Sequence, residues 1–189
     1  TVTAKWNLSE EAVARINDKY YASIQNAIND SIENDKIYLL KNTEESPLND
    51  KNVILDLNGY ELTIISGKDR VIENVGKLEI IDSSIEQTGI IKIDKTGYVI
   101  YNRNAGYLKI TAGTLNAGGT GNYTYSYGIY NQNAGNVEIT GGTISCNSSG
   151  SNPHGYGIYN YGNVIIRGGI IDNSINKSDS YGIYNADIG

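Results

Sequence analysis

The sequence predicts an all-β fold: a right-handed single-stranded parallel β-helix with three strands in each coil, preceded by an N-terminal hairpin and a capping α-helix. Two observations lead to this prediction. A unit of 25 to 29 residues recurs from about Asn52 onward, and each unit holds three short runs of alternating apolar and polar residues joined by Gly or Asn. Because recurrence at a fixed period is typical of stacked repeats and alternation is typical of strands, each unit is expected to form one coil.

Three parts are expected along the chain. Residues 1–10 are interpreted as a linker or the tail of a preceding module, residues 11–51 as an N-terminal cap, and residues 52–189 as the coils. Nothing in the last few residues resembles a capping element, so the natural protein is expected to continue beyond Gly189.

The cap is expected to begin with a hairpin. The runs Ala12 to Ile16 and Lys19 to Tyr21 flank the turn-forming pair Asn17-Asp18. A helix that starts at Ser9, with two acidic residues in its first turn, is the competing interpretation.

A single amphipathic helix is expected next, with Ser23 as its N-cap. Its function would be to cover the open end of the first coil, where apolar interior and unpaired strand edges would otherwise meet water. A strand is predicted from Ile37 to Leu40, and residues 42–51 are read as a polar loop. The apolar face of the helix is formed by residues at helical spacing: Ile24, Ala27, Ile28 and Ile32.

The first coil is expected at residues 52–64, as two apolar strands bent at Asn58-Gly59. After it, three families of strand recur. The first family carries the motif YGIYN, and its aligned isoleucines are spaced by 28, 29, 29 and 25 residues: Ile72, Ile100, Ile129, Ile158 and Ile183. The second and third families begin at Val75, Ala105, Ala134 and Tyr161, and at Thr88, Ala112, Gly141 and Gly168. Helical solenoids lack such period-two runs, and a propeller blade needs a fourth strand, so parallel coils are favoured.

Stacking in register places like residues in columns, and alternation decides which columns point inward. Cys146 falls in an inward column and is interpreted as a small core residue, not a reactive thiol. Glu79, Lys109 and Glu138 form an outward column of alternating charge. The inward columns are Leu78, Leu108, Val137 and Val164; Ile80, Ile110, Ile139 and Ile166; Ile91, Leu115, Ile144 and Ile171; and Ile93, Ala117 and Cys146. A column of asparagines is expected to form a ladder of stacked side-chain amides at the turns: Asn102, Asn131, Asn160 and Asn185.

Composition excludes several classes of function. The net charge of −6 argues against a nucleic-acid partner, which would require a basic surface. The single cysteine permits neither an internal disulfide nor a cysteine zinc site, and no apolar run reaches the length of a membrane span. No cofactor is indicated.

The order of hairpin, ASIQNAIND, KIYLL and NVILDLNGYELTI resembles the entry of pectate-lyase-like β-helix domains in surface proteins of Gram-positive bacteria, and the NVEITGGTIS and YGIYN units resemble their coils. TVTAKW at residues 1–6 is similar to the closing strand of the β-grasp repeats of internalin-like proteins. The resemblance implies an extracellular location on the cell surface or wall, an adhesin or display-stalk role, and neighbouring modules in the same chain.

A column of tyrosines is the candidate binding site. Its parity is opposite to that of the inward isoleucines, so the rings are expected to form an outward stripe that binds a glycan or a host surface protein. The alternative is that the rings only stack on one another across strands. A second column, Tyr98, Tyr127, Tyr156 and Tyr181, shares the parity of the core isoleucines and is expected to be partly buried structure. The candidate ligand-binding residues are Tyr101, Tyr130, Tyr159 and Tyr184.

Enzymatic activity, as a polysaccharide lyase or glycoside hydrolase, is the alternative function that the resemblance suggests. A hydrolase needs two facing carboxyl groups, but Asp82, Asp94, Glu138 and Asp172 fall in different columns. Lyases of this architecture typically bind calcium through clustered Asp, and the sequence shows no such cluster. The only histidine, His154, is interpreted as a surface residue of a polar loop.

Overall fold

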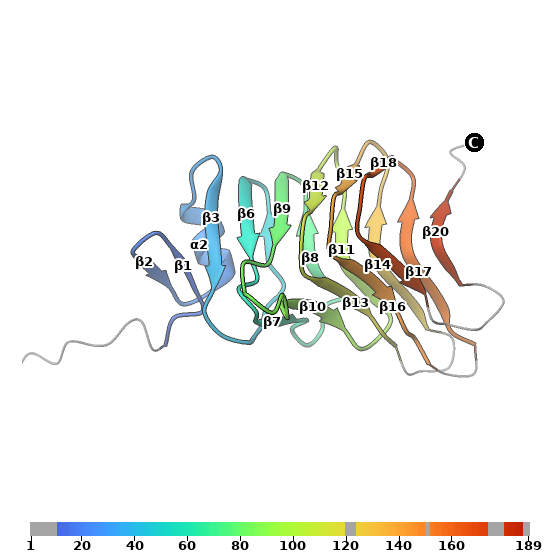
Figure 1. Ribbon diagram of the computed structural model, residues 1–189, viewed down its shortest axis with the longest axis horizontal. Helices are drawn as coiled ribbons and strands as arrows, with labels where there is room; N and C mark the ends of the chain where they lie inside the picture. The colour runs from blue at the N-terminus through green and yellow to red at the C-terminus, as the bar shows by residue number, and fades with distance from the viewer. Residues whose placement is uncertain (1–10, 120–123, 150–151, 174–179, 187–189) are drawn as a thin grey trace, which may run out of the picture.

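The computed structural model describes residues 11–119, 124–149, 152–173 and 180–186. It shows a right-handed parallel β-helix in which the chain passes in turn through three sheets, named sheets A, B and C here. Figure 1 shows the coils stacked along the long axis of the molecule, from the cap at the blue end to β20 at the red end. The predicted fold class is confirmed.

Each sheet takes one strand from every coil. Sheet A contains β3 (Asp35–Leu39), β6 (Asn52–Asp56), β9 (Lys77–Ile81), β12 (Tyr107–Ile110), β15 (Asn136–Ile139) and β18 (Asn163–Ile166). Sheet B contains β4 (Thr43–Glu44), β7 (Glu61–Thr63), β10 (Ile90–Ile93), β13 (Thr114–Ala117), β16 (Thr143–Cys146) and β19 (Ile170–Asn173). Sheet C contains β5 (Leu48–Asn49), β8 (Arg70–Asn74), β11 (Gly97–Asn102), β14 (Tyr125–Asn131), β17 (His154–Asn160) and β20 (Tyr181–Asn185).

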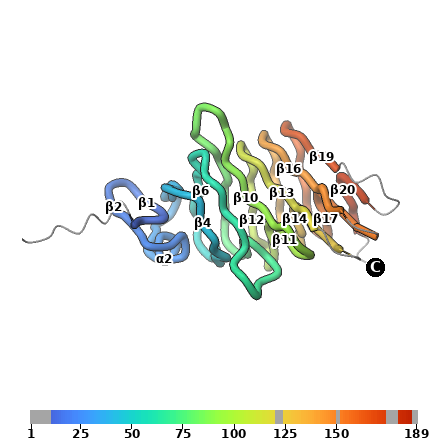
Figure 2. Tube along the Cα trace, turned by 90° about the horizontal axis from the view of Figure 1, so that it is seen from below, coloured from blue at the N-terminus to red at the C-terminus, as the bar shows by residue number. Residues whose placement is uncertain are grey.

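The predicted register is confirmed in sheet C. Parallel pairing joins Ile72 to Ile100, Ile100 to Ile129, Ile129 to Ile158 and Ile158 to Ile183. The tube in Figure 2 shows the resulting coils side by side along the axis.

The core is the interior of this tube. The inward columns are buried from Leu78 to Ile158, and Cys146 is fully buried, as expected of a small core residue. Burial raises the pKa of the Cys146 thiol, since a thiolate would be poorly solvated there. In the last described coil, Ile166 and Ile183 are 43% and 41% exposed, because no described residues cover that end.

The predicted asparagine ladder is present and is longer than expected. Each side-chain Nδ2 donates to the Oδ1 of the next asparagine at 2.7–3.0 Å. Asn131 Nδ2 also donates to the carbonyl oxygen of Gly135, 3.0 Å away, so the ladder provides a hydrogen-bond donor for the backbone of the turn. Asn49 and Asn74 extend it into the first coils, giving the series Asn49, Asn74, Asn102, Asn131, Asn160 and Asn185.

The hairpin is confirmed as β1 (Ala14–Ile16) and β2 (Lys19–Tyr21), which pair antiparallel around Asn17, a residue with φ of 49°. Strand β1 also pairs antiparallel with β3 and joins the hairpin to sheet A. The start of the alternative helix, Ser9, lies outside the described residues.

Helix α2 (Ile24–Asp30) has the predicted N-cap: Ser23 Oγ accepts from the Asn26 amide at 3.0 Å. Ile32, predicted on its apolar face, is instead 74% exposed. The helix ends earlier because Ser31 is extended and donates its N–H and Oγ–H to the Ile28 carbonyl, at 3.1 and 2.7 Å. The chain beyond Ser31 therefore no longer follows the helical face.

The helix covers the first coil, as predicted. Ile24 and Ile28 are buried and line a small enclosed space with core residues such as Ile37, Leu55 and Ile72. Glu45 fixes this cap: its two carboxylate oxygens accept from the backbone N–H groups of Ile24 and Gln25, both at 2.7 Å. A carboxylate at a helix N-terminus satisfies amides that have no partner within the helix.

Residues 42–51 were predicted to be a polar loop, and this prediction is wrong in part. They contain β4 and β5, which pair in parallel with β7 and β8, so coil-like pairing already starts at β3. Strands of two residues are too short to show an alternating pattern in the sequence. The following coil bends as predicted, with Asn58 and Gly59 at φ of 49° and 81°. Among the described residues, the structure contains no helix with the length and apolar character of a membrane span.

Candidate binding surface: a tyrosine face on sheet C

The outer surface of sheet C carries two rows of tyrosines, which together with Tyr161 are called the tyrosine face here. Both rows run along the axis, with one residue from each of β11, β14, β17 and β20. Ring contacts connect all nine residues. The first row is Tyr98, Tyr127, Tyr156 and Tyr181, and the second row is Tyr101, Tyr130, Tyr159 and Tyr184.

The second row lies on the surface, as predicted, but the first row is not on the opposite side of the strand. The Tyr98 and Tyr101 rings are stacked with their centroids 5.4 Å apart. Two successive residues between them, Val99 and Ile100, are both buried. Tyr98 pairs with Tyr127 and Ile100 pairs with Ile129, but Val99 between them has no paired residue. The same gap recurs in the other strand pairs of sheet C, so the strand is bent at this position in each coil.

This bend interrupts the simple alternation used for the prediction and brings both rows to one face. A signal for it is present in the sequence. The residue before the isoleucine is Gly in three of the units, Gly128, Gly157 and Gly182, so it has no side chain that must find space in the core. A Cβ on Gly128 would lie 2.6 Å from the Gly157 carbonyl oxygen.

Within each row, successive rings lie against one another. Centroids are 5.0, 5.1 and 5.8 Å apart in the first row and 5.5, 5.3 and 4.9 Å apart in the second. Tyr127 and Tyr156 are nearly parallel, at 9°, as are Tyr130 and Tyr159, at 4°. Between the rows, the rings of the two middle strands are nearly perpendicular, at 87° for Tyr127 and Tyr130 and 80° for Tyr156 and Tyr159, whereas Tyr98 and Tyr101 are stacked at 29°.

The faces of the middle rings are therefore directed mainly toward other rings, in the offset and edge-to-face arrangements that aromatic pairs prefer. The predicted alternative, mutual stacking across strands, describes this geometry. A partner would therefore meet ring edges and phenolic hydroxyl groups, of which the Tyr101 hydroxyl already donates to Gln132 at 3.0 Å and those of Tyr159 and Tyr161 lie 3.3 Å apart.

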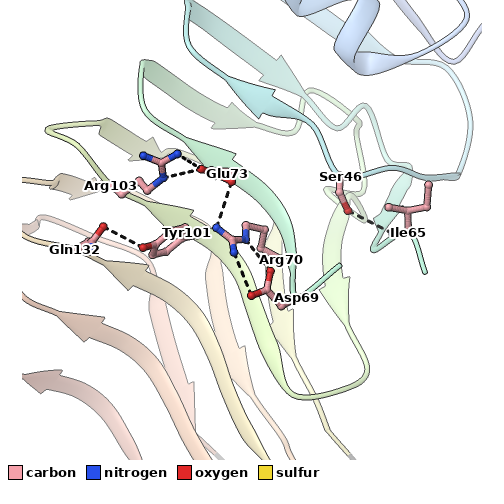
Figure 3. A network of polar contacts seen from close by, with 8 residues as sticks. All are labelled: Ser46, Ile65, Asp69, Arg70, Glu73, Tyr101, Arg103 and Gln132. Atoms are coloured by element: carbon pink, nitrogen blue, oxygen red, sulfur yellow. Dashed lines mark hydrogen bonds and ion pairs between the residues drawn. The ribbon is translucent and has the colours of Figure 1, made fainter. Parts of the chain in front are cut away.

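At the N-terminal end of the two rows, charged residues take the place of tyrosines: Arg70 pairs with Tyr98 and Glu73 pairs with Tyr101. The Arg70 guanidinium lies 4.6 Å from the centre of the Tyr101 ring, a cation–π contact. Figure 3 shows that Glu73 accepts hydrogen bonds from both Arg70 (3.2 Å) and Arg103 (2.6 Å from Nε). Arg70 also binds Asp69, so both guanidinium groups are paired with carboxylates.

The phenol groups of the face are kept un-ionised. Burial is the largest cause that raises the pKa of Tyr130, to about 12, and burial likewise raises the pKa of Tyr127. A hydrogen bond with Tyr161, whose oxygen lies 3.3 Å away, raises the pKa of Tyr159. Because a phenol ionises only near pH 10 even in water, the face is an uncharged array of hydroxyl donors and acceptors at neutral pH.

His154 was predicted to lie in a polar loop, but in the structure it is the first residue of β17. Its ring is stacked on that of Tyr125, with centroids 4.5 Å apart and planes at 4°. The pair continues the aromatic surface of sheet C beyond the first row of tyrosines.

Of the acidic residues considered for catalysis, Asp82, Glu138 and Asp172 lie at different places on the coils. Asp82 is buried and accepts from the backbone amides of Gly59 and Gly89, at 2.9 and 2.6 Å, which is a structural role. Glu138 lies on sheet A and accepts from Tyr107 and Arg167, whereas Asp172 lies on sheet B. The described residues contain no group of three or more His, Cys, Asp or Glu side chains that could hold a metal ion.

The outward charged column on sheet A is confirmed: Lys109 Nζ lies 2.9 Å from a Glu79 carboxylate oxygen. It forms an ordinary solvated face of paired charges and adds no site.

Comparisons with protein-family models, curated proteins and solved structures find no significant match.

Proposed function

We propose that this chain is a non-enzymatic module of a bacterial cell surface that adheres to a carbohydrate or protein partner through the tyrosine face. The observation that supports the proposal is the continuous contact of nine tyrosine rings, eight of them on four successive strands of one sheet and the ninth, Tyr161, directly after β17. Tyrosine combines a large rigid contact area with a hydroxyl group and loses little conformational entropy on binding, which is why it is common in binding surfaces.

The scaffold suits such a role. Each coil is tied to the next by strand pairing and by the buried asparagine ladder, so the rows of rings are held in fixed relative positions. A rigid array needs less ordering when it binds, and contacts repeated along the axis add to one another.

The proposal is tested by comparing the wild-type chain with a double variant, Tyr130→Ala with Tyr159→Ala, on a glycan array and on immobilised host-surface proteins. We expect the wild-type chain to bind at least one partner and the double variant to lose most of that signal. Tyr20→Ala is the matched control, since Tyr20 is 44% exposed but lies on the N-terminal hairpin.

Circular dichroism of each variant checks that the coils are intact. Absence of binding by the wild-type chain, or equal binding by the folded double variant, would refute adhesion through this face and leave a purely architectural stalk. Antibody labelling of intact cells tests the proposed location.

A further inference from the structure

We infer that the tyrosine face binds an extended, uncharged polysaccharide that lies along the axis of the β-helix and is held by the rows of phenolic hydroxyl groups. This inference rests on the proposed function and specifies the partner class and the mode of contact. Three features of the face support it: its repeat, its charge and the orientation of its rings.

The repeat of the face is one strand spacing. The same two tyrosines recur in register on β11, β14, β17 and β20, and ring centroids within a row advance by 4.9–5.8 Å. One pyranose of an extended β-1,4-linked chain has about the length of this spacing between paired strands. Successive pyranoses of such a chain are turned by about half a revolution, so a repeating polymer can present the same hydroxyl groups to every second coil, whereas a folded protein surface presents a non-repeating set of anchors.

The charge of the face excludes an acidic polymer. Across the two rows the described side chains are phenols, which are neutral at pH 7, and burial or hydrogen bonding raises the pKa of three of them further: Tyr127, Tyr130 and Tyr159. The cations at the N-terminal end of the rows, Arg70 and Arg103, are already paired with Asp69 and Glu73. A polyuronate would lose hydration of its carboxylates at this surface without gaining a free counter-charge.

The ring orientation decides the mode of contact. A sugar that stacks on aromatic faces needs a ring face open to solvent, but Tyr127 and Tyr156 have stacked neighbours on both sides. In the second row, Tyr130 and Tyr159 stack on each other and have a tilted ring on the other side. Their hydroxyl groups are both donors and acceptors, which suits the equatorial hydroxyl groups of a neutral sugar chain. Contact is therefore made by hydroxyl groups and ring edges.

The test uses the full chain with soluble cello- and chito-oligosaccharides of increasing length, measured by isothermal titration calorimetry, and with insoluble cellulose and chitin in depletion assays. We expect the affinity for the oligosaccharides to rise with length until the oligomer is as long as the row of four rings, and polygalacturonate not to bind. The variant Tyr130→Phe with Tyr159→Phe keeps the rings and removes two hydroxyl groups, so binding should weaken about tenfold or more. Tyr20→Phe should bind like the wild type.

Full binding by the Phe variant would overturn hydroxyl recognition in favour of ring contacts. Equal affinity for polygalacturonate, or affinity independent of oligosaccharide length, would overturn the neutral, extended ligand. Binding of a host protein without any binding of neutral glycans would overturn this inference while leaving adhesion through the tyrosine face in place.

Discussion

The asparagine ladder makes a sharp test of the fold, and Asn131→Ala is the substitution that probes it best. Asn131 is fully buried in the middle of the ladder. Its Oδ1 accepts from Asn102 at 2.8 Å, and its Nδ2 donates to Asn160 Oδ1 at 2.8 Å and to the Gly135 carbonyl at 3.0 Å. The Nδ2 group also donates to the Asn163 carbonyl, at 3.3 Å, so alanine removes four hydrogen bonds.

The expected loss of stability follows from the hydrogen bonds that each former partner of Asn131 keeps. The Gly135 carbonyl still accepts from the Asn163 amide, and Asn160 Oδ1 still accepts from the Gly162 amide, both at 2.9 Å. The Asn102 N–H that pointed to Asn131 is left facing a small gap. The three shorter hydrogen bonds at about 1 kcal/mol each, including one orphaned buried donor, give an expected loss of about 2–4 kcal/mol in the free energy of unfolding.

Urea denaturation followed by circular dichroism measures this loss. Asn133→Ala is the control, because Asn133 is exposed on the adjacent turn, and it should change the stability by less than about 0.5 kcal/mol. Asn131→Asp should cost more than Asn131→Ala, since it turns an acceptor oxygen toward the carbonyl of Gly135 and toward Asn160 Oδ1. Equal stability of Asn131→Ala and Asn133→Ala would show that the ladder contributes nothing and would refute the reasoning.

Three further predictions concern ionisation, the cap and the core. The Tyr107 pKa is raised to about 12, first by its hydrogen bond to a carboxylate, and burial raises the Tyr130 pKa to about 12. Because these folded-state pKa values lie above the ordinary value of 10.0, the stability that the two phenols contribute is complete below about pH 10 and is lost as the pH rises toward about 12. A pH series of unfolding curves detects this loss, and constant stability across that window would contradict the prediction. Glu45→Ala removes two hydrogen bonds to the start of α2 and should lower the free energy of unfolding by about 1–3 kcal/mol, as measured by chemical denaturation. Glu44 is exposed, so Glu44→Ala should be nearly neutral, and equal effects of the two substitutions would argue against a role of Glu45 in holding the helix. The Cys146 thiol should react with a thiol reagent only after the chain is unfolded, and rapid reaction of the folded protein would mean that the coil opens there.

Much of the fold could be predicted from local patterns, because stacking in register repeats one residue at one position of every coil. The isoleucine spacing predicted the coil length, the alternating runs predicted three sheets, and the buried position of Cys146 followed from its column. The hairpin and the Ser23 cap were equally accessible, since both depend on signals within a few residues.

The candidate site was only half predictable. Alternation alone placed Tyr130 on the surface and Tyr127 with the core, but the bend at Gly128 turns both rings to one face. Such a bend is a property of paired strands and of the space that the next coil leaves, so a single run of residues does not reveal it.

By itself, the sequence determined the repeat, the inward columns, the asparagine ladder and the presence of a cap, because each depends on spacing along the chain. Only the tertiary structure decided where the first strands lie, since residues 42–51 form strands through their pairing with the next coil. It alone also decided that the tyrosines form one face with their rings directed toward each other. Ring orientation depends on neighbours about 29 residues away in the chain and one strand spacing away in space.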